Sequence, residues 1–174
     1  DVCSSDLLLG EGFAQLDLPP HGSGGGSDAQ VVSAGAALAL PVLARRTAAA
    51  GLTGLEFFVG IPGSVGGAVR MNAGGHGCQS ADVLESATVF DLRAATQHTR
   101  GADTLDFSYR HSNVGPDEVV VAAQWRVRPD DALRCTARVD EIVAWRRAHQ
   151  PGGANAGSVF ANPPGDSAGR LVEA

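Results

Sequence analysis

GLTGLEFFVGIPGSVGGAVRMNAGGHG, residues 51–77, is the stretch of the sequence that indicates most about fold and function. Nine of its 27 residues are glycine, and this density leaves backbone N–H groups uncovered by side chains. We expect the turn at residues 63–67 to direct several of these groups at an anion such as a pyrophosphate, with Ser64 and Asn72 as further donors. The glycine spacing matches neither the dinucleotide-binding pattern nor the phosphate-loop pattern, so a tightly packed turn without a ligand explains the same residues.

All 13 basic side chains of the 174-residue sequence are arginines, which excludes several functions that depend on lysine. A phosphate loop of the Walker type, a Schiff-base nucleophile and a pyridoxal-phosphate anchor each require a lysine amine. The sequence carries 19 acidic residues and a net charge of −6, and its longest basic runs are the pairs Arg45-Arg46 and Arg146-Arg147. Because binding to nucleic acid requires clustered cations, we expect no nucleic-acid partner.

The cysteines and the hydropathy pattern limit the class of protein further. Cys3, Cys78 and Cys135 are odd in number and irregularly spaced, which predicts neither a disulfide framework nor a metal site and favours a reducing compartment such as the cytoplasm. No apolar run approaches the roughly 20 residues needed to cross a bilayer. We therefore expect a globular protein without metal and without membrane insertion, whose core comes from its 44% apolar residues.

The segments around the glycine-rich stretch have patterns of both strands and helices. Strands are expected at 14–18, 29–34, 85–92 and 118–128. Helices are expected at 38–50, at 130–149 and, with an Asp or Ser cap, at 166–174. Their inward faces are expected to carry Leu40, Leu43, Ala44 and Thr47 in the first helix and Cys135, Val139, Ile142 and Val143 in the second. Because no strand-helix rhythm repeats, the predicted class is α+β.

Three ordered motifs give the sequence a specific family resemblance. The glycine-rich segment 54–74 resembles the flavin-binding signature of the UDP-N-acetylenolpyruvoylglucosamine reductase family. Segment 107–112, FSYRHS, resembles the Tyr-Arg active-site motif of that family. Segments 146–151 and 157–163 resemble its substrate-binding arm and its catalytic serine loop. The resemblance extends over nearly the whole of residues 7–174.

The resemblance implies both a fold and a reaction. Residues 1–129 are expected to form the second half of a flavin-binding α+β domain of the PCMH/VAO type, and residues 130–174 a linking helix and the start of a C-terminal α+β substrate-binding domain. The implied reaction is the NADPH-dependent, FAD-mediated reduction of the enolpyruvyl group of UDP-N-acetylglucosamine-enolpyruvate to UDP-N-acetylmuramate, a peptidoglycan precursor. The expected ligands are therefore FAD, NADPH and the enolpyruvyl sugar, and no protein partner is predicted.

Arg110 and Ser158 are the catalytic residues that the resemblance implies. A guanidinium that binds both oxygens of the substrate carboxylate stabilises the charge that develops there, and a serine hydroxyl donates the proton to the adjacent carbon. Cofactor binding is implied for Gly60, Ile61, Pro62, Gly63, Ser64, Val65, Gly66, Gly67 and Asn72. Substrate binding is implied for Tyr109, Arg146, His149 and Asn162. Trp125 and Trp145 are expected in the core.

The sequence also departs from the family pattern. The family's N-terminal Gly-Ser-Asn loop and its C-terminal glutamate segment do not occur, so we expect a chain truncated at both ends and inactive by itself. His149 and Ala161 stand where family members usually carry lysine. The missing lysines are therefore expected to affect substrate affinity and its pH dependence, through the nucleotide-binding arm. Two alternatives remain: another FAD-dependent oxidoreductase of the same superfamily, and a non-catalytic nucleotide-binding domain.

Overall fold

The computed structural model describes residues 10–19, 29–150, 162–163 and 165–173. Its centre is an antiparallel sheet with the strand order β1-β2-β8-β6-β7, and β3 pairs with the end of β8. The strands are β1 (Leu16–Asp17), β2 (Gln30–Gly35), β3 (Leu52–Thr53), β6 (Leu84–Asp91), β7 (Thr96–Gly101) and β8 (Glu118–Pro129). The four strands expected from the sequence correspond to β1, β2, β6 and β8, whereas β7 was not expected.

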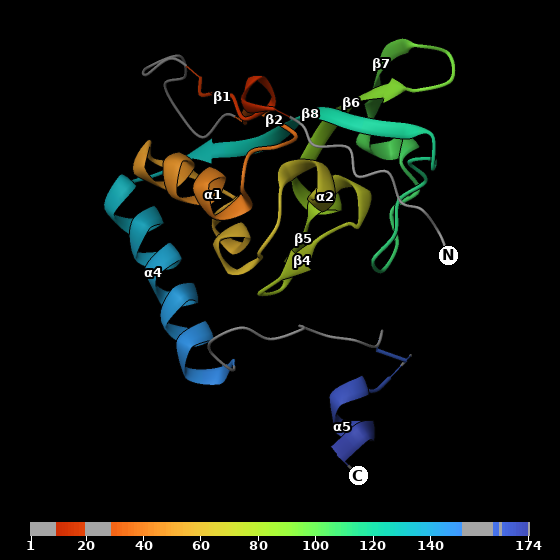
Figure 1. Cartoon of the computed structure of the whole chain (residues 1–174). Helices are drawn as coiled ribbons and strands as arrows, with labels where there is room; N and C mark the ends of the chain where they lie inside the picture. Colours follow the sequence, from red (N-terminus) through yellow and green to blue (C-terminus); the bar gives the residue numbers. More distant parts are fainter. Residues whose placement is uncertain (1–9, 20–28, 151–161, 164, 174) are drawn as a thin grey trace.

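Helices α1, α2 and α4 gather on one side of this sheet (Figure 1). The helices are α1 (Leu40–Ala49), α2 (Val65–Arg70), α3 (Ser80–Val83), α4 (Ala132–His149) and α5 (Ala168–Glu173). Three short 3₁₀ helices accompany them, η1 (Glu11–Phe13), η2 (Glu56–Gly60) and η3 (Ala102–Thr104). Within the described ranges, none of the helices combines the length and the apolar character that crossing a membrane requires.

Helix α1 buries the face that its hydrophobic spacing predicts. Leu40, Leu43, Ala44 and Thr47 are all buried. Pro41 lies in the first turn, where its missing N–H costs the helix no hydrogen bond. The hydroxyl of Thr47 donates to the carbonyl oxygens of the preceding turn, so this polar side chain is satisfied inside the core. The expected inward stripe is confirmed.

Helix α4 begins at a cap and is fastened to the domain by its first half. The Asp131 carboxylate accepts a hydrogen bond of 3.0 Å from the backbone N–H of Arg134. Cys135 and Val139 are buried in the core that α1, η2 and the sheet share, and the expected inner face continues with two partly buried residues, Ile142 and Val143. Beside this apolar face, the guanidinium of Arg138 lies 3.0 Å from the Asp130 carboxylate and 3.5 Å from that of Glu56.

The two tryptophans occupy different environments. Trp125, on β8, is fully buried, and its ring and that of Phe58 pack in a T-shaped arrangement with centroids 5.0 Å apart. Trp145, on α4, is 47% exposed and stacks on the imidazole of His149, with ring centroids 4.7 Å apart. The expectation of two core tryptophans is therefore wrong for Trp145, because the last turns of α4 extend past the core that buries its first half.

The glycine-rich stretch folds into η2, α2 and a small hairpin of β4 (Gly74–Gly75) and β5 (Cys78–Gln79). Backbone hydrogen bonds to the segment that precedes α1 fix its path. The N–H of Leu40 donates to the carbonyl of Gly63, and the N–H of Val65 donates to the carbonyl of Leu38, both at 2.9 Å. This pairing places the first turn of α2 beside the end of β2 and the middle of the sheet.

Candidate functional site

A groove of about 450 Å³ lies along the first turn of α2 and contains three of the predicted cofactor-binding residues. Ser64, Gly66 and Gly67 line it together with residues 114–116 and the beginning of β8. Ser64 caps α2, and its hydroxyl accepts a hydrogen bond of 3.4 Å from the N–H of Gly67. The groove also contains Arg70, at the other end of the same helix.

The backbone N–H groups of this turn are mostly engaged within the protein. Val65 donates to Leu38, Gly66 donates to the carbonyl of Ala36 at 2.9 Å, and Gly67 donates to the Ser64 hydroxyl. The expectation that several N–H groups of the turn point together at an anion is therefore not met by these three groups. The physical reason is that each backbone N–H is a single donor, and a donor that is bonded to an internal acceptor is not available to a ligand.

The glycines of the turn serve different purposes. A Cβ on Gly66 would lie 3.1 Å from the Cβ of Ala36 and 3.5 Å from the carbonyl oxygen of Val120, so this glycine permits close packing between α2 and the sheet. Gly63 has a φ of 146°, and a Cβ there would meet nothing within 4 Å. At Gly63 the requirement is thus conformational, and the space beside it is open.

A second pocket, of about 320 Å³, lies beyond the C-terminal end of α2 and brings together three residues predicted from separate motifs. Asn72, from the glycine-rich stretch, lines it together with Tyr109 and Arg110, from the Tyr-Arg motif. Residues of β4, β5 and the hairpin between them complete the wall, and Asp82 of α3 adds a carboxylate. Tyr109 is 62% exposed, and the guanidinium carbon of Arg110 lies 5.8 Å from the centre of its ring.

Cys78 is a reactive side-chain type in this pocket that sequence reasoning did not select as functional. Burial and then the neighbouring Asp82 carboxylate raise the pKa of the Cys78 thiol above its ordinary value. Because the thiolate is the nucleophilic form, the raised pKa keeps this thiol protonated and weakly reactive. Arg110 supplies a positive charge for an anionic ligand of this pocket, and the hydroxyl of Tyr109 supplies a hydrogen-bond donor.

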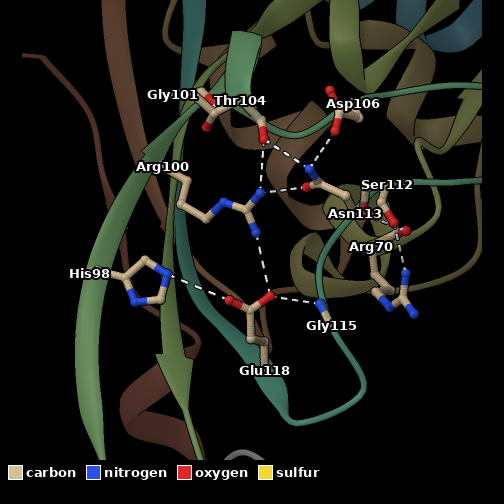
Figure 2. Close-up of polar contacts among 10 residues, drawn as sticks. All are labelled: Arg70, His98, Arg100, Gly101, Thr104, Asp106, Ser112, Asn113, Gly115 and Glu118. Carbon is tan, nitrogen blue, oxygen red and sulfur yellow. Dashed lines mark hydrogen bonds and ion pairs between the residues drawn. The ribbon is translucent and has the colours of Figure 1, made fainter. Parts of the chain in front are cut away.

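A polar network braces the loop that carries Tyr109 and Arg110 (Figure 2). The guanidinium of Arg100, on β7, donates to the carbonyl of Thr104 at 2.8 Å and to the side-chain oxygen of Asn113, and it pairs with the Glu118 carboxylate at 3.4 Å. Glu118 also accepts a hydrogen bond of 2.6 Å from the N–H of Gly115. Both ends of the loop at residues 105–117 are thus tied to the sheet.

The remaining predicted residues lie apart from the two pockets. Ile61 is half-buried and Pro62 is exposed, while Gly60 packs against the His76 ring and Ile142 of α4. The side chain of Val65 is fully buried in the core.

The predicted substrate-binding residues of the arm are also placed separately. Arg146 donates to the side chain of Gln150 at 2.8 Å, and the Nδ1 atom of His149 lies 2.8 Å from the carbonyl oxygen of Trp145. The side-chain oxygen of Asn162 accepts a hydrogen bond of 2.9 Å from the N–H of Ala168. Ser158 and Ala161 lie outside the described residues.

Arg70 is a site residue that sequence reasoning missed. It lines the groove, and its Nη1 atom donates a hydrogen bond of 3.1 Å to the carbonyl oxygen of Ser112, near the Tyr-Arg turn. The signal that could have found it is that Arg70 is the single arginine of the glycine-rich stretch at residues 51–77.

Comparisons with known proteins identify the family that this chain resembles in sequence and in fold. Residues 25–100 match the family model described as an FAD binding domain. The chain is 43% identical over 168 residues to UDP-N-acetylenolpyruvoylglucosamine reductase of Acidiphilium cryptum, a match that covers 96% of this chain and 51% of the relative. It is 44% identical over 177 residues to the reductase of Rhodopseudomonas palustris strain BisB5, covering 98% of this chain and 56% of that protein.

A solved structure of similar fold shows the same relationship. The crystal structure of UDP-N-acetylenolpyruvylglucosamine reductase from Thermus caldophilus matches with a TM-score of 0.73 and 39% identity, covering 81% of this chain and 52% of that one. The fold and the family match define a mixed α+β domain of the flavin-binding class. The chain belongs to the UDP-N-acetylenolpyruvoylglucosamine reductase family, and it spans about half the length of the relatives it matches.

Proposed function

We propose that this chain supplies two parts of an enzyme that reduces an enolpyruvyl nucleotide sugar with NADPH, through FAD. One part is the groove along α2, called the flavin-side groove below, and the other is the turn that carries Tyr109 and Arg110. The observation that carries the proposal is the pocket shared by Asn72, Tyr109 and Arg110, because the glycine-rich stretch and the Tyr-Arg motif form it jointly. The product would be UDP-N-acetylmuramate, a precursor of peptidoglycan. Relatives that carry the reductase name support the choice of reaction.

The groove along α2 fits part of a flavin nucleotide. It offers about 450 Å³ and the guanidinium of Arg70 as a positive charge. A planar cation that is held at Ser112 is suited to the anionic part of a nucleotide, since its remaining N–H groups can form charge-assisted hydrogen bonds. FAD would supply the relay of a hydride from NADPH to the enolpyruvyl group when it is bound.

Arg110 is the residue that we assign to the substrate carboxylate. Reduction of the enolpyruvyl double bond pushes negative charge towards the carboxylate, and a guanidinium that binds both oxygens stabilises that charge in the transition state. Arg110 lies in an exposed turn beside the pocket, so a substrate can reach it without unfolding the loop. We assign Tyr109, which is adjacent and exposed, to contact with the same ligand.

Ser158 and the arm complete the proposed reaction. We assign the proton donated to the adjacent carbon to the Ser158 hydroxyl, on the basis of the sequence motif that contains it. Arg146, His149 and Asn162 are assigned to the nucleotide part of the substrate, with the guanidinium of Arg146 as the donor to its diphosphate. His149 replaces the usual lysine there, so only its protonated form provides a charge at that position.

Two measurements test the proposal. The chain is incubated with FAD and freed of excess by gel filtration, and bound flavin is detected by its visible absorbance. Because the sequence predicts that this chain is inactive by itself, NADPH consumption is then followed, with and without the enolpyruvyl sugar, in a chimera in which the chain replaces the matching half of a full-length relative. Bound flavin with sugar-dependent consumption is the expected result. Bound flavin with consumption that ignores the sugar would favour another FAD-dependent oxidoreductase, and failure to retain flavin would contradict the proposed groove.

A further inference from the structure

The turn that carries Arg110 has a backbone conformation that needs support from its surroundings. Ser108 and His111 exchange two backbone hydrogen bonds, of 3.1 and 3.2 Å, which leaves Tyr109 and Arg110 at the tip. Arg110 has a φ of 56°, in the left-handed region that non-glycine residues rarely adopt. Such a conformation persists only when neighbouring groups determine it, so the contacts on either side of the tip decide where the guanidinium lies.

Asn72 holds the N-terminal side of the tip. Its side chain is 4% exposed, and one amide N–H donates a hydrogen bond of 3.0 Å to the carbonyl oxygen of Ser108. The same amide nitrogen donates to the side chain of Gln79 at 3.1 Å, and the side-chain oxygen accepts from the N–H of Ala81 at 3.0 Å. Both amide hydrogens are thus engaged, and the orientation of the side chain is determined from three directions.

Arg70 holds the C-terminal side of the tip. Its Nη1 atom donates to the carbonyl oxygen of Ser112, and the hydroxyl of Ser112 donates back to the carbonyl oxygen of Arg70 at 2.8 Å. Ser112 is fully buried, so these two bonds are shielded from competition with water. Figure 2 shows this pair beside the Arg100 network, which ties the following residues to the sheet.

We propose that Asn72 and Arg70 are positioning residues that together hold the Tyr109–Arg110 turn in place. The two residues flank Met71 at the end of α2. A single short segment therefore forms hydrogen bonds with both sides of a turn, across 36 and 42 positions of the chain. The geometry of the pocket around Arg110 then depends on the end of the helix that lines the flavin-side groove. Loss of either residue is expected to loosen the turn, which is the structural consequence, and to lower turnover, which is the catalytic consequence. Only the catalytic consequence rests on the role proposed above for Arg110.

The structural consequence is tested by limited proteolysis with trypsin. The chain has no lysine, so trypsin cleaves only after arginine, and 12 of its 13 arginines are sites because Pro129 follows Arg128. Mass spectrometry distinguishes the products. Asn72→Ala is expected to accelerate cleavage after Arg110 about five- to tenfold. This is the increase in the population of the locally unfolded turn that is expected when one or two net hydrogen bonds are lost. Cleavage after Arg93, which lies in the turn between β6 and β7, is expected to stay within about twofold.

Two further variants make this test decisive. Gln124→Ala removes an exposed amide that bonds only to Ser86 on the sheet surface in the described structure, and it is expected to leave both cleavage rates unchanged. Arg70→Met removes the donor to Ser112 and keeps the aliphatic stem, and it is expected to accelerate cleavage after Arg110 even if Asn72→Ala does not fold. Unchanged cleavage after Arg110 would overturn the proposal, as would equal acceleration after Arg93, which indicates general unfolding.

The catalytic consequence is tested by steady-state kinetics with NADPH and the enolpyruvyl sugar, in the chimera of this chain with the other half of a relative. Asn72→Ala is expected to lower kcat with the sugar about tenfold or more, because displacing a catalytic group by about 1 Å is sufficient for such a loss. The KM for NADPH is expected to stay within about twofold, which general damage to the protein would not allow. A wild-type chimera without sugar-dependent turnover would contradict the proposed function alone, since proteolysis still decides whether Asn72 and Arg70 position the turn.

Discussion

Gly66 packs so closely against Ala36 that a Cβ added to the glycine would lie 3.1 Å from the alanine Cβ and 3.4 Å from its carbonyl oxygen. The N–H of Gly66 also donates a hydrogen bond of 2.9 Å to that carbonyl. The first turn of α2 is therefore joined to the residue that follows β2 by both packing and hydrogen bonding. The close approach determines the distance between α2 and the sheet, and both of these line the groove.

Replacing this glycine is expected to destabilise the protein. Gly66→Ala should lower the free energy of unfolding by about 1–2 kcal/mol, because the new methyl group meets a rigid neighbour in a packed region. The matched control is Gly67→Ala, whose Cβ would lie 3.6 Å from the Ser64 hydroxyl. That change should be neutral or stabilise by up to about 1 kcal/mol through helix propensity. Urea unfolding measures both, and equal stability of the two variants would contradict the packing argument.

Removing the guanidinium of Arg110 is expected to reduce turnover without reducing stability, since the side chain is exposed. In the chimera with the other half of a relative, Arg110→Ala should lower kcat/KM for the enolpyruvyl sugar by about 10² to 10³. Arg110→Lys should restore only part of it, because an ammonium cannot bind two carboxylate oxygens in parallel. Arg128→Lys, at an exposed position on β8, serves as the control. Full activity of Arg110→Lys would show that charge alone is sufficient at this position.

The carboxylate of Glu56 is expected to contribute more to stability than an exposed one. Glu56 is 8% exposed, and it accepts hydrogen bonds of 2.7 Å from both the Thr53 hydroxyl and the N–H of Gly54. Glu56→Ala should cost about 2–3 kcal/mol, because it leaves donors without their acceptor. Glu85→Ala breaks an ion pair whose side chains are 44% and 47% exposed and should cost less than about 0.5 kcal/mol. Similar losses in thermal or chemical unfolding would refute this distinction.

Asp130 is expected to make stability depend on pH in the acidic range. The backbone N–H of Asp131 and then the guanidinium of Arg138 lower the pKa of the Asp130 carboxyl below its ordinary value of 3.8. Its contribution is therefore fully present above about pH 3.8 and is lost as the pH falls through the lower pKa of the folded state. Melting temperatures between pH 6 and 3 should fall less steeply for Asp130→Asn than for the wild type. An unchanged slope for Asp130→Asn would contradict this assignment.

Local sequence patterns predicted the elements whose burial repeats with a regular period. Helix α1 is an example, because its apolar residues recur every three to four positions and all of the predicted inward residues are buried. Strand β7 was missed for the complementary reason. Its residues are polar and largely exposed, so it has no alternating pattern, and its pairing with β6 holds it in the sheet.

Long-range packing decided features that no local pattern carries. Helix α2 forms from a segment with two consecutive glycines, which have low helix propensity, because Ser64 caps it and backbone bonds to residues 36 and 38 fix its start. Trp145 follows the apolar face of α4 in the sequence, but the helix has left the core by that point. Its exposure could be known only from where the core ends.

The sequence by itself determined the α+β class, the family resemblance and the residue types of the site, since these reside in composition and short motifs. The tertiary structure decided which of those residues meet. Arg110 and Asn72 line one pocket, and Asn72 holds the carbonyl of Ser108, because pairing between distant strands brings a helix end and a loop together. A hydrogen bond across 36 positions depends on the folded path of the whole sheet, and therefore no motif in either segment could specify it.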